Sequence, residues 1–69
     1  MATFIRLTLV AELAALNNRP IWVNLNNITT VVEEENHTTL WLVNSTVDYP
    51  RNLTVKETPD EIFHIGEEI

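Results

Sequence analysis

Apolar and polar residues alternate along most of this chain, which is the pattern of β-strands with one buried face. Five alternating segments predict strands, at residues 4–10, 21–23, 28–33, 38–43 and 52–56. Residues 24–27 and 34–37 between them are rich in Asn and Glu and predict tight corners, whereas 44–50 predicts a polar loop. Residues 11–16 are helix formers, but the segment is too short for more than one helical turn within a connection. The alternation therefore predicts a mainly β fold, either a five-strand antiparallel meander or a small open barrel.

The end of the chain changes period and predicts a short C-terminal helix. Thr58 can cap this helix, Pro59 suits its first position, and Glu61 stands at the reciprocal position of a capping box. Since Gly66 is a poor helix former, we expect the helix to end near it. The apolar side chains at three- and four-residue spacing form one stripe: Ile62, Ile65 and Ile69, with Phe63 beside them.

The same alternation places apolar side chains on both faces of the predicted sheet. The face that the helix can cover carries Ile5, Leu7, Leu9, Ile21, Val23, Ile28, Val32, Leu40, Leu42, Leu53 and Val55. The opposite face carries Phe4, Val10, Trp22, Val31, Trp41 and Val43. In a meander, Trp22, Val31 and Trp41 would form a row across neighbouring strands. No second helix is predicted that could cover this row.

Two Trp residues on an otherwise exposed face form an apolar patch that monomers rarely leave open. Trp is also a frequent anchor of protein interfaces. We therefore expect self-association, most simply as a twofold homodimer. The expected interface residues are Phe4, Trp22, Val31, Trp41 and Val43. Two alternatives are a sheet that curls into a barrel, and a register that differs by one residue and places both Trp in an ordinary core.

Composition and charge narrow the class of protein. The 69 residues make one small domain, residues 1–69, with 45% hydrophobic and 20% charged residues, as in globular proteins. Four Lys and Arg against ten Asp and Glu give a net charge of −6. The basic residues are dispersed, which disfavours nucleic acid and anionic lipid as partners. Without a membrane-length apolar run, a signal-peptide pattern or a Cys residue, we expect a soluble cytoplasmic protein with no membrane insertion.

Residues that could carry catalysis are few. Ser45 lies in the predicted polar loop without a glycine elbow, and His64 lies on the predicted helix without a nucleophile pattern beside it. The only glycine, Gly66, excludes a Gly-rich phosphate loop. We therefore expect no enzymatic activity and no cofactor.

A metal site is a separate alternative at the corner formed by residues 34–37. Glu33, Glu35 and His37 would share one face of an extended strand, and carboxylate and imidazole groups are metal ligands. A hairpin tip offers no enclosing second layer of residues to orient such ligands. We therefore favour a solvated acidic tip, which also opposes edge-to-edge pairing, and no bound metal.

Four segments of the chain together form a wider pattern: FIRLTL, RPIWVNLNNITTVVEE, TTLWL and LTVKETPDEI. They resemble the small FlbD/SwrD-like proteins of bacteria, which carry an I-x-L-T strand, a P-I-x-V-N-x-x-x-I corner, a T-x-x-x-L hairpin and a V-x-E-S-P-E-E-I ending. The similarity covers most of the chain except residues 11–17 and 44–50, where the family has Gly-containing turns that this chain lacks. The resemblance implies a role in bacterial motility or a phage-encoded role, and it implies no catalytic residues.

The sequence thus predicts a non-enzymatic accessory protein that acts by protein–protein contact and self-associates. The alternative is a small β-barrel that binds nucleic acid or a regulator, with Trp22 and Trp41 stacking on bases. The two hypotheses differ in their salt dependence, because binding to phosphates weakens steeply as salt rises.

Overall fold

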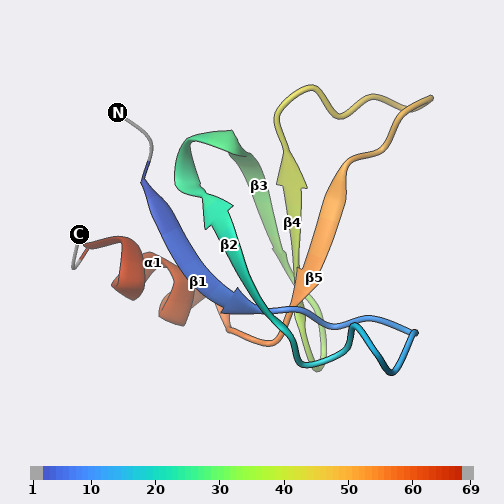
Figure 1. The fold of residues 1–69 in the computed structure, drawn as a ribbon. Coiled ribbons are helices and arrows are strands. Elements are labelled where there is room, and N and C mark those ends of the chain that lie inside the picture. The colour runs from blue at the N-terminus through green and yellow to red at the C-terminus, as the bar shows by residue number, and fades with distance from the viewer. Residues whose placement is uncertain (1–2, 68–69) are drawn as a thin grey trace.

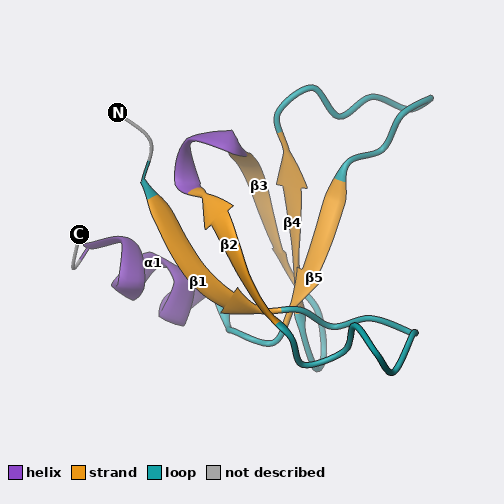
Figure 2. Ribbon diagram, in the orientation of Figure 1, coloured by secondary structure: helices purple, strands orange, loops and turns teal. Residues whose placement is uncertain are grey.

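The computed structural model describes residues 3–67, which form five antiparallel strands and a C-terminal α-helix (Figures 1 and 2). The strands are β1 (Phe4–Thr8), β2 (Pro20–Asn24), β3 (Ile28–Glu33), β4 (Thr38–Leu42) and β5 (Asn52–Val55). The 3₁₀-helix η1 (Leu25–Asn27) joins β2 to β3, and the α-helix α1 spans Pro59–Glu67. The mainly β fold class with a C-terminal helix is thus confirmed.

The strands form two sheets rather than one continuous meander. β1 pairs with β2 in the first sheet, and the second has the order β3-β4-β5. The expected pairing of the second and third strands is wrong, because η1 turns the chain between them. Asn24 caps η1 by accepting a hydrogen bond from the backbone N–H of Asn26 at 3.0 Å. Within residues 3–67, β2 and β3 therefore each have a neighbouring strand on one side only.

The two sheets meet at the end of β1, where the chain runs on to pair with β5 (Figure 1). A bridge joins Leu9 to Val55, and the Val10 N–H donates a hydrogen bond to the Thr54 carbonyl at 2.8 Å. Elsewhere, α1 contacts both β1 and β3. The described strands therefore do not close into a barrel, and α1 contributes to the enclosure of the core.

The same end of β1 is also hydrogen-bonded to a carboxylate, which belongs to the segment between β5 and α1. Glu57 accepts two hydrogen bonds from Thr8, one from its backbone N–H at 2.8 Å and one from its hydroxyl at 2.9 Å. Both residues are partly buried. Hydrogen bonds to an ionised carboxylate are about twice as strong as neutral ones. Glu57 therefore ties the first strand to a segment 49 positions away.

The core lies between the two sheets and α1. Its buried apolar residues come from both sheets and the helix: Ile5, Leu7, Val23, Leu40, Val55 and Ile62. The strand residues among them all belong to the face that the sequence predicts as buried. The N-terminal sheet, the C-terminal sheet and α1 therefore share one core.

An irregularity in β3 exchanges two predicted positions. The pairing with β4 shifts between Ile28 and Thr30, so that Thr29 is an extra residue in β3. Because strand side chains alternate, one extra residue reverses the side to which the following side chains point. Val31 accordingly packs against the core and Val32 is exposed. The expectation that Val31 faces outward and Val32 inward is wrong for this reason.

The N-terminus of α1 carries the Thr58 half of the predicted capping box, and the Glu61 carboxylate bonds the Thr58 hydroxyl rather than its backbone N–H. The Thr58 hydroxyl accepts a hydrogen bond from the Glu61 N–H at 3.2 Å and donates one to the Glu61 carboxylate at 3.3 Å. Pro59 is the first helical residue, and the described helix ends at Glu67, next to Gly66. The predicted start of the helix is thus confirmed, whereas its predicted end near Gly66 falls at the limit of the described residues.

The apolar stripe of α1 is narrower than the sequence suggests. Ile62 is buried and Ile65 is partly buried against the core, whereas Phe63 remains 57% exposed. Ile69 lies outside the described residues. A Cβ atom at Gly66 would lie 3.2 Å from Leu25 Cδ1, so the last turn of α1 packs closely on η1. Phe63 is therefore free to contribute to a surface rather than to the core.

We expect Thr58→Ala to lower the free energy of unfolding by about 1 kcal/mol, because the Glu61 N–H at the start of α1 would lose its side-chain acceptor. Urea denaturation followed by circular dichroism measures this loss. Thr58→Ser keeps the hydroxyl and is the matched control, which should lose much less stability. Equal losses for the two variants would show that the hydroxyl does not act as a cap.

Candidate functional site

The outward face of the first sheet carries two exposed aromatic side chains. Trp22 is 66% exposed and Phe4 is 53% exposed. In the β1–β2 register Trp22 lies directly across from Arg6, and Phe4 lies across from Asn24. Phe4 and Trp22 are therefore diagonal neighbours on one face, within reach of each other. We call Phe4, Arg6 and Trp22 the β1–β2 outer face.

Trp41 lies on the outer face of the other sheet and is only partly exposed. Its neighbours across the strands are Thr30 on β3 and Asn52 on β5. The row predicted across adjacent strands does not form, because Val31 points to the core and Trp22 and Trp41 belong to different sheets. The separation follows from the 3₁₀ corner between β2 and β3, which prevents the two strands from pairing.

Val43, the remaining predicted interface residue, lies just beyond β4. Its N–H donates a hydrogen bond to the Asn27 carbonyl at 2.7 Å, which places it beside the η1 corner. Its side chain is 41% exposed. Of the predicted interface residues, Phe4 and Trp22 therefore share one face, and the other three lie elsewhere.

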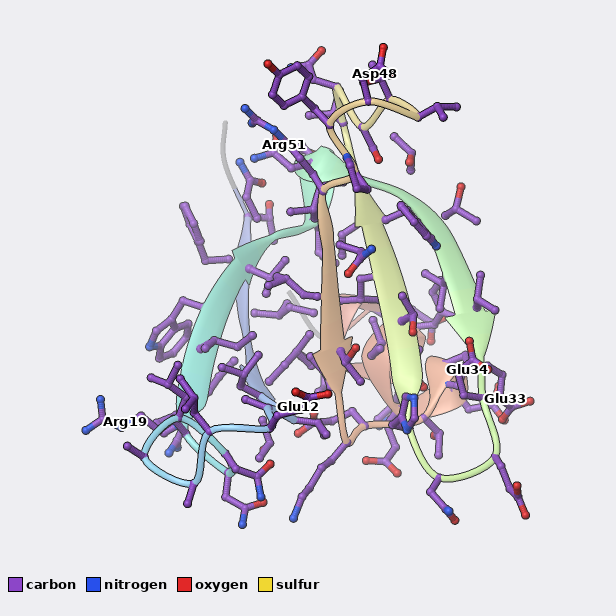
Figure 3. All side chains as sticks on the ribbon, turned by 90° about the vertical axis from the view of Figure 1, so that its right-hand side faces the viewer. Glu12, Arg19, Glu33, Glu34, Asp48 and Arg51 are labelled. Carbon is purple, nitrogen blue, oxygen red and sulfur yellow. The ribbon has the colours of Figure 1, made fainter. Side chains whose placement is uncertain are left out.

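The loop between β4 and β5 exposes two apolar side chains in a segment that the sequence predicts as polar. Val47 and Tyr49 are both highly exposed. Within this loop, the Tyr49 N–H donates a hydrogen bond to the Thr46 hydroxyl at 2.9 Å. Figure 3 shows Asp48 at the end of this loop, beyond the strands. Isolated apolar residues in a loop follow no period, so the alternation pattern gives no signal for them.

The hairpin between β3 and β4 carries the acidic tip that the sequence predicts. Its turn is closed by the Glu34 N–H, which donates a hydrogen bond to the His37 carbonyl at 2.8 Å. Glu33, Glu35 and His37 line a shallow hollow there together with other residues of the turn. Within residues 3–67, however, no group of three His, Asp or Glu side chains is arranged to hold a metal ion. The alternative of a metal site at these three residues therefore gains no support.

The two residues considered for catalysis lie far apart. Ser45 belongs to the β4–β5 loop and His64 to α1, at opposite ends of the molecule in Figure 1. The Ser45 hydroxyl accepts a hydrogen bond from the Arg51 N–H at 3.0 Å, so it serves the loop. The fold therefore does not combine these two residues into one site.

A groove of about 320 Å³ lies between η1, β3 and α1. Its lining is apolar apart from one hydroxyl: Leu25, Ile28, Thr29, Val31, Ile62 and Phe63. We call these residues the α1–β3 groove. The groove is not predicted from the sequence because Val31 changes face at the irregularity in β3, and because Phe63 is expected in the core.

Comparison of the chain with models of known families, with curated proteins and with solved structures found no match. Among the helices of residues 3–67, none combines the length and apolar character needed to cross a lipid bilayer. The surfaces described above are therefore the basis for a functional proposal.

Proposed function

We propose that this protein is a non-enzymatic interaction module that self-associates as a twofold dimer through the β1–β2 outer face. The observation that carries the proposal is the exposure of Phe4 and Trp22 as diagonal neighbours on one strand pair. Burying a large apolar side chain contributes about 1.5–3 kcal/mol. Aromatic residues are also enriched at the centre of protein interfaces. A twofold contact uses the same face of both copies and so covers both pairs of rings.

Arg6 gives this face a polar complement to the rings. It lies directly across from Trp22, so the guanidinium of one copy can stack on the indole of the other. Such cation–π contacts are worth about 0.5–2 kcal/mol. They offer Arg6 a partner when water is excluded from the interface.

The net charge sets the salt dependence of this association. Two copies of charge −6 repel each other at long range, and added salt screens this repulsion. We therefore infer that dimerisation strengthens as salt rises. Binding to nucleic acid, the alternative function, would weaken under the same change.

The resemblance to FlbD/SwrD-like proteins supports an accessory role in bacterial motility or a phage-encoded role, exercised in the cytoplasm. Neither setting requires catalysis. The neighbouring genes test this part of the proposal. A flagellar operon would favour motility, whereas a phage cassette would favour the other setting.

We expect Trp22→Ser to shift the protein from dimer to monomer in sedimentation experiments at micromolar concentration. Loss of an interface Trp costs about 2 kcal/mol or more, which weakens association at least about thirtyfold. The circular dichroism spectrum should not change, because the side chain is largely exposed. Leu13→Ser is the matched control, since Leu13 is 67% exposed on the β1–β2 connection.

Three results would contradict the proposed dimer. A wild-type chain that sediments as a monomer at all concentrations would exclude self-association. Dissociation by Trp41→Ser but not by Trp22→Ser would move the interface to the second sheet. Equal dissociation by Trp22→Ser and the control Leu13→Ser would point to a general loss of solubility or fold.

A further inference from the structure

The α1–β3 groove lies beside β3, an edge strand of the three-stranded sheet. Within residues 3–67, β3 pairs with β4 and with no second strand. Thr29 and Val31 of β3 line the groove. An open strand edge presents backbone N–H and C=O groups to which an extended segment can add as a further strand.

The floor of the groove accepts a large apolar side chain. Its volume of about 320 Å³ exceeds the roughly 150 Å³ of an apolar cavity that binds benzene. Phe63 forms part of its wall and is 57% exposed, so an occupant would cover apolar surface that this chain leaves in water. The groove therefore offers both backbone pairing and a pocket for one side chain, which together define strand-addition sites.

Negative charge follows the apolar floor along the same strand. β3 ends in the acidic run 33–35, whose side chains are exposed. The hollow at this end is lined by residues 33–38, Lys56 and Thr58, the residue directly before α1. The first turn of α1 adds Asp60 and Glu61. One cation, Lys56, lies in that lining against this acidic group.

The negative charge at one end of the groove favours some bound segments over others. A segment lying along β3 would place one side chain over the apolar floor and, about three positions away at 3.3 Å per residue, other side chains beside the acidic run. Lys or Arg fits there, and acidic residues would be repelled. A second copy of this chain, with net charge −6, is a poor match for this end of the groove.

We propose that the α1–β3 groove binds an extended segment of a partner protein that carries a bulky apolar residue and a short run of Lys or Arg. The segment adds to the free edge of β3, its apolar side chain enters the groove beside Phe63, and its cations face the acidic run 33–35. This site shares no residue with the β1–β2 outer face. The inference therefore does not depend on self-association.

Fluorescence anisotropy with synthetic peptides tests the proposal on the full chain. The probes are labelled, strand-forming peptides of about ten residues that contain one Phe and, about three positions away from it, a run of three Lys. One peptide has the Phe before the Lys run and the other has it after, because strands can add in either direction. We expect one order to bind at micromolar concentration. Replacing its Phe with Ser, or its Lys residues with Glu, should each weaken binding at least about tenfold, corresponding to 1.4 kcal/mol or more.

Variants of the protein locate the site. We expect Phe63→Ser and Glu34→Lys each to weaken peptide binding at least about tenfold, while the circular dichroism spectrum stays unchanged because both side chains are exposed. Tyr49→Ser is the control for Phe63→Ser, an exposed aromatic residue in the β4–β5 loop. Glu12→Lys makes the same change in net charge as Glu34→Lys, and Figure 3 shows Glu12 away from Glu33 and Glu34. Both controls should bind within about twofold of the wild type.

Three outcomes would overturn the proposal. The first is that neither peptide binds at millimolar concentration. The second is that binding is equally sensitive to Glu12→Lys and Glu34→Lys, which would reduce it to nonspecific attraction of opposite charges. The third is that Phe63→Ser converts a dimer to monomers, which would make a second copy the occupant of the groove. Peptide binding that survives Trp22→Ser would separate this site from the proposed dimer interface.

Discussion

Leu40→Ala should lower the free energy of unfolding by about 2–5 kcal/mol, the usual cost of deleting a buried Leu side chain and leaving a cavity. Leu40 is 0% exposed and lies on β4, the central strand of the three-stranded sheet. At about 0.05–0.15 kcal/mol per residue, a chain of this length has only roughly 3–10 kcal/mol of stability in total. The substitution should therefore remove a large fraction of the stability and raise the population of unfolded chains.

Urea denaturation monitored by circular dichroism measures this effect. Leu13→Ala is the matched control, because it deletes the same atoms from a side chain that is 67% exposed. Exposed substitutions usually change stability by less than about 0.5 kcal/mol. A similar loss for both variants would contradict the placement of Leu40 at the centre of the core.

Glu57→Ala should have the second largest effect, a loss of about 1–3 kcal/mol. The variant removes both acceptors of the Thr8 hydrogen bonds and leaves a partly buried backbone N–H without its partner. Glu57→Gln retains one acceptor oxygen and should lose less. Glu12 is an exposed carboxylate in the β1–β2 connection, so Glu12→Ala controls for the change in net charge. This substitution should change the free energy of unfolding very little.

A double-mutant cycle attributes the loss to the Glu57–Thr8 contact. Thr8→Val removes the hydroxyl donor at 2.9 Å and keeps the shape of the side chain. Residues in direct contact couple by about 0.5–3 kcal/mol, so the double variant should lose less than the two single losses combined. Additive losses would mean that Glu57 stabilises the fold by some other contact.

The features that the sequence predicts correctly depend on near neighbours in the chain. The five strands follow from alternation within each segment, and the start of α1 follows from Thr58 and Glu61, three residues apart. The corner at η1 follows from Asn24, whose side chain accepts the hydrogen bond that caps the turn. Local propensities and hydrogen bonds of this kind act without knowledge of the rest of the fold.

The features that the sequence does not predict depend on how the elements meet. The alternation of apolar and polar residues does not reveal that Thr29 is an extra residue in β3. This extra residue nevertheless turns Val31 from the outer face to the core. The 3₁₀ corner separates β2 from β3 and so places Trp22 and Trp41 on different sheets. The outward orientation of Trp22 is visible from alternation alone, but its neighbours on the surface are set by strand pairing.

The contact of Glu57 with Thr8 also has consequences for how the chain folds. The strand pairs β1–β2, β3–β4 and β4–β5 each join segments close in sequence, whereas the junction of the two sheets joins residues 49 positions apart. Closing so long a loop reduces the entropy of the chain, and this cost arises before the junction gains any favourable contact. Docking of the N-terminal hairpin onto β5 is therefore the step expected to limit the folding rate, and substitutions at the junction should slow refolding more than those within a hairpin turn.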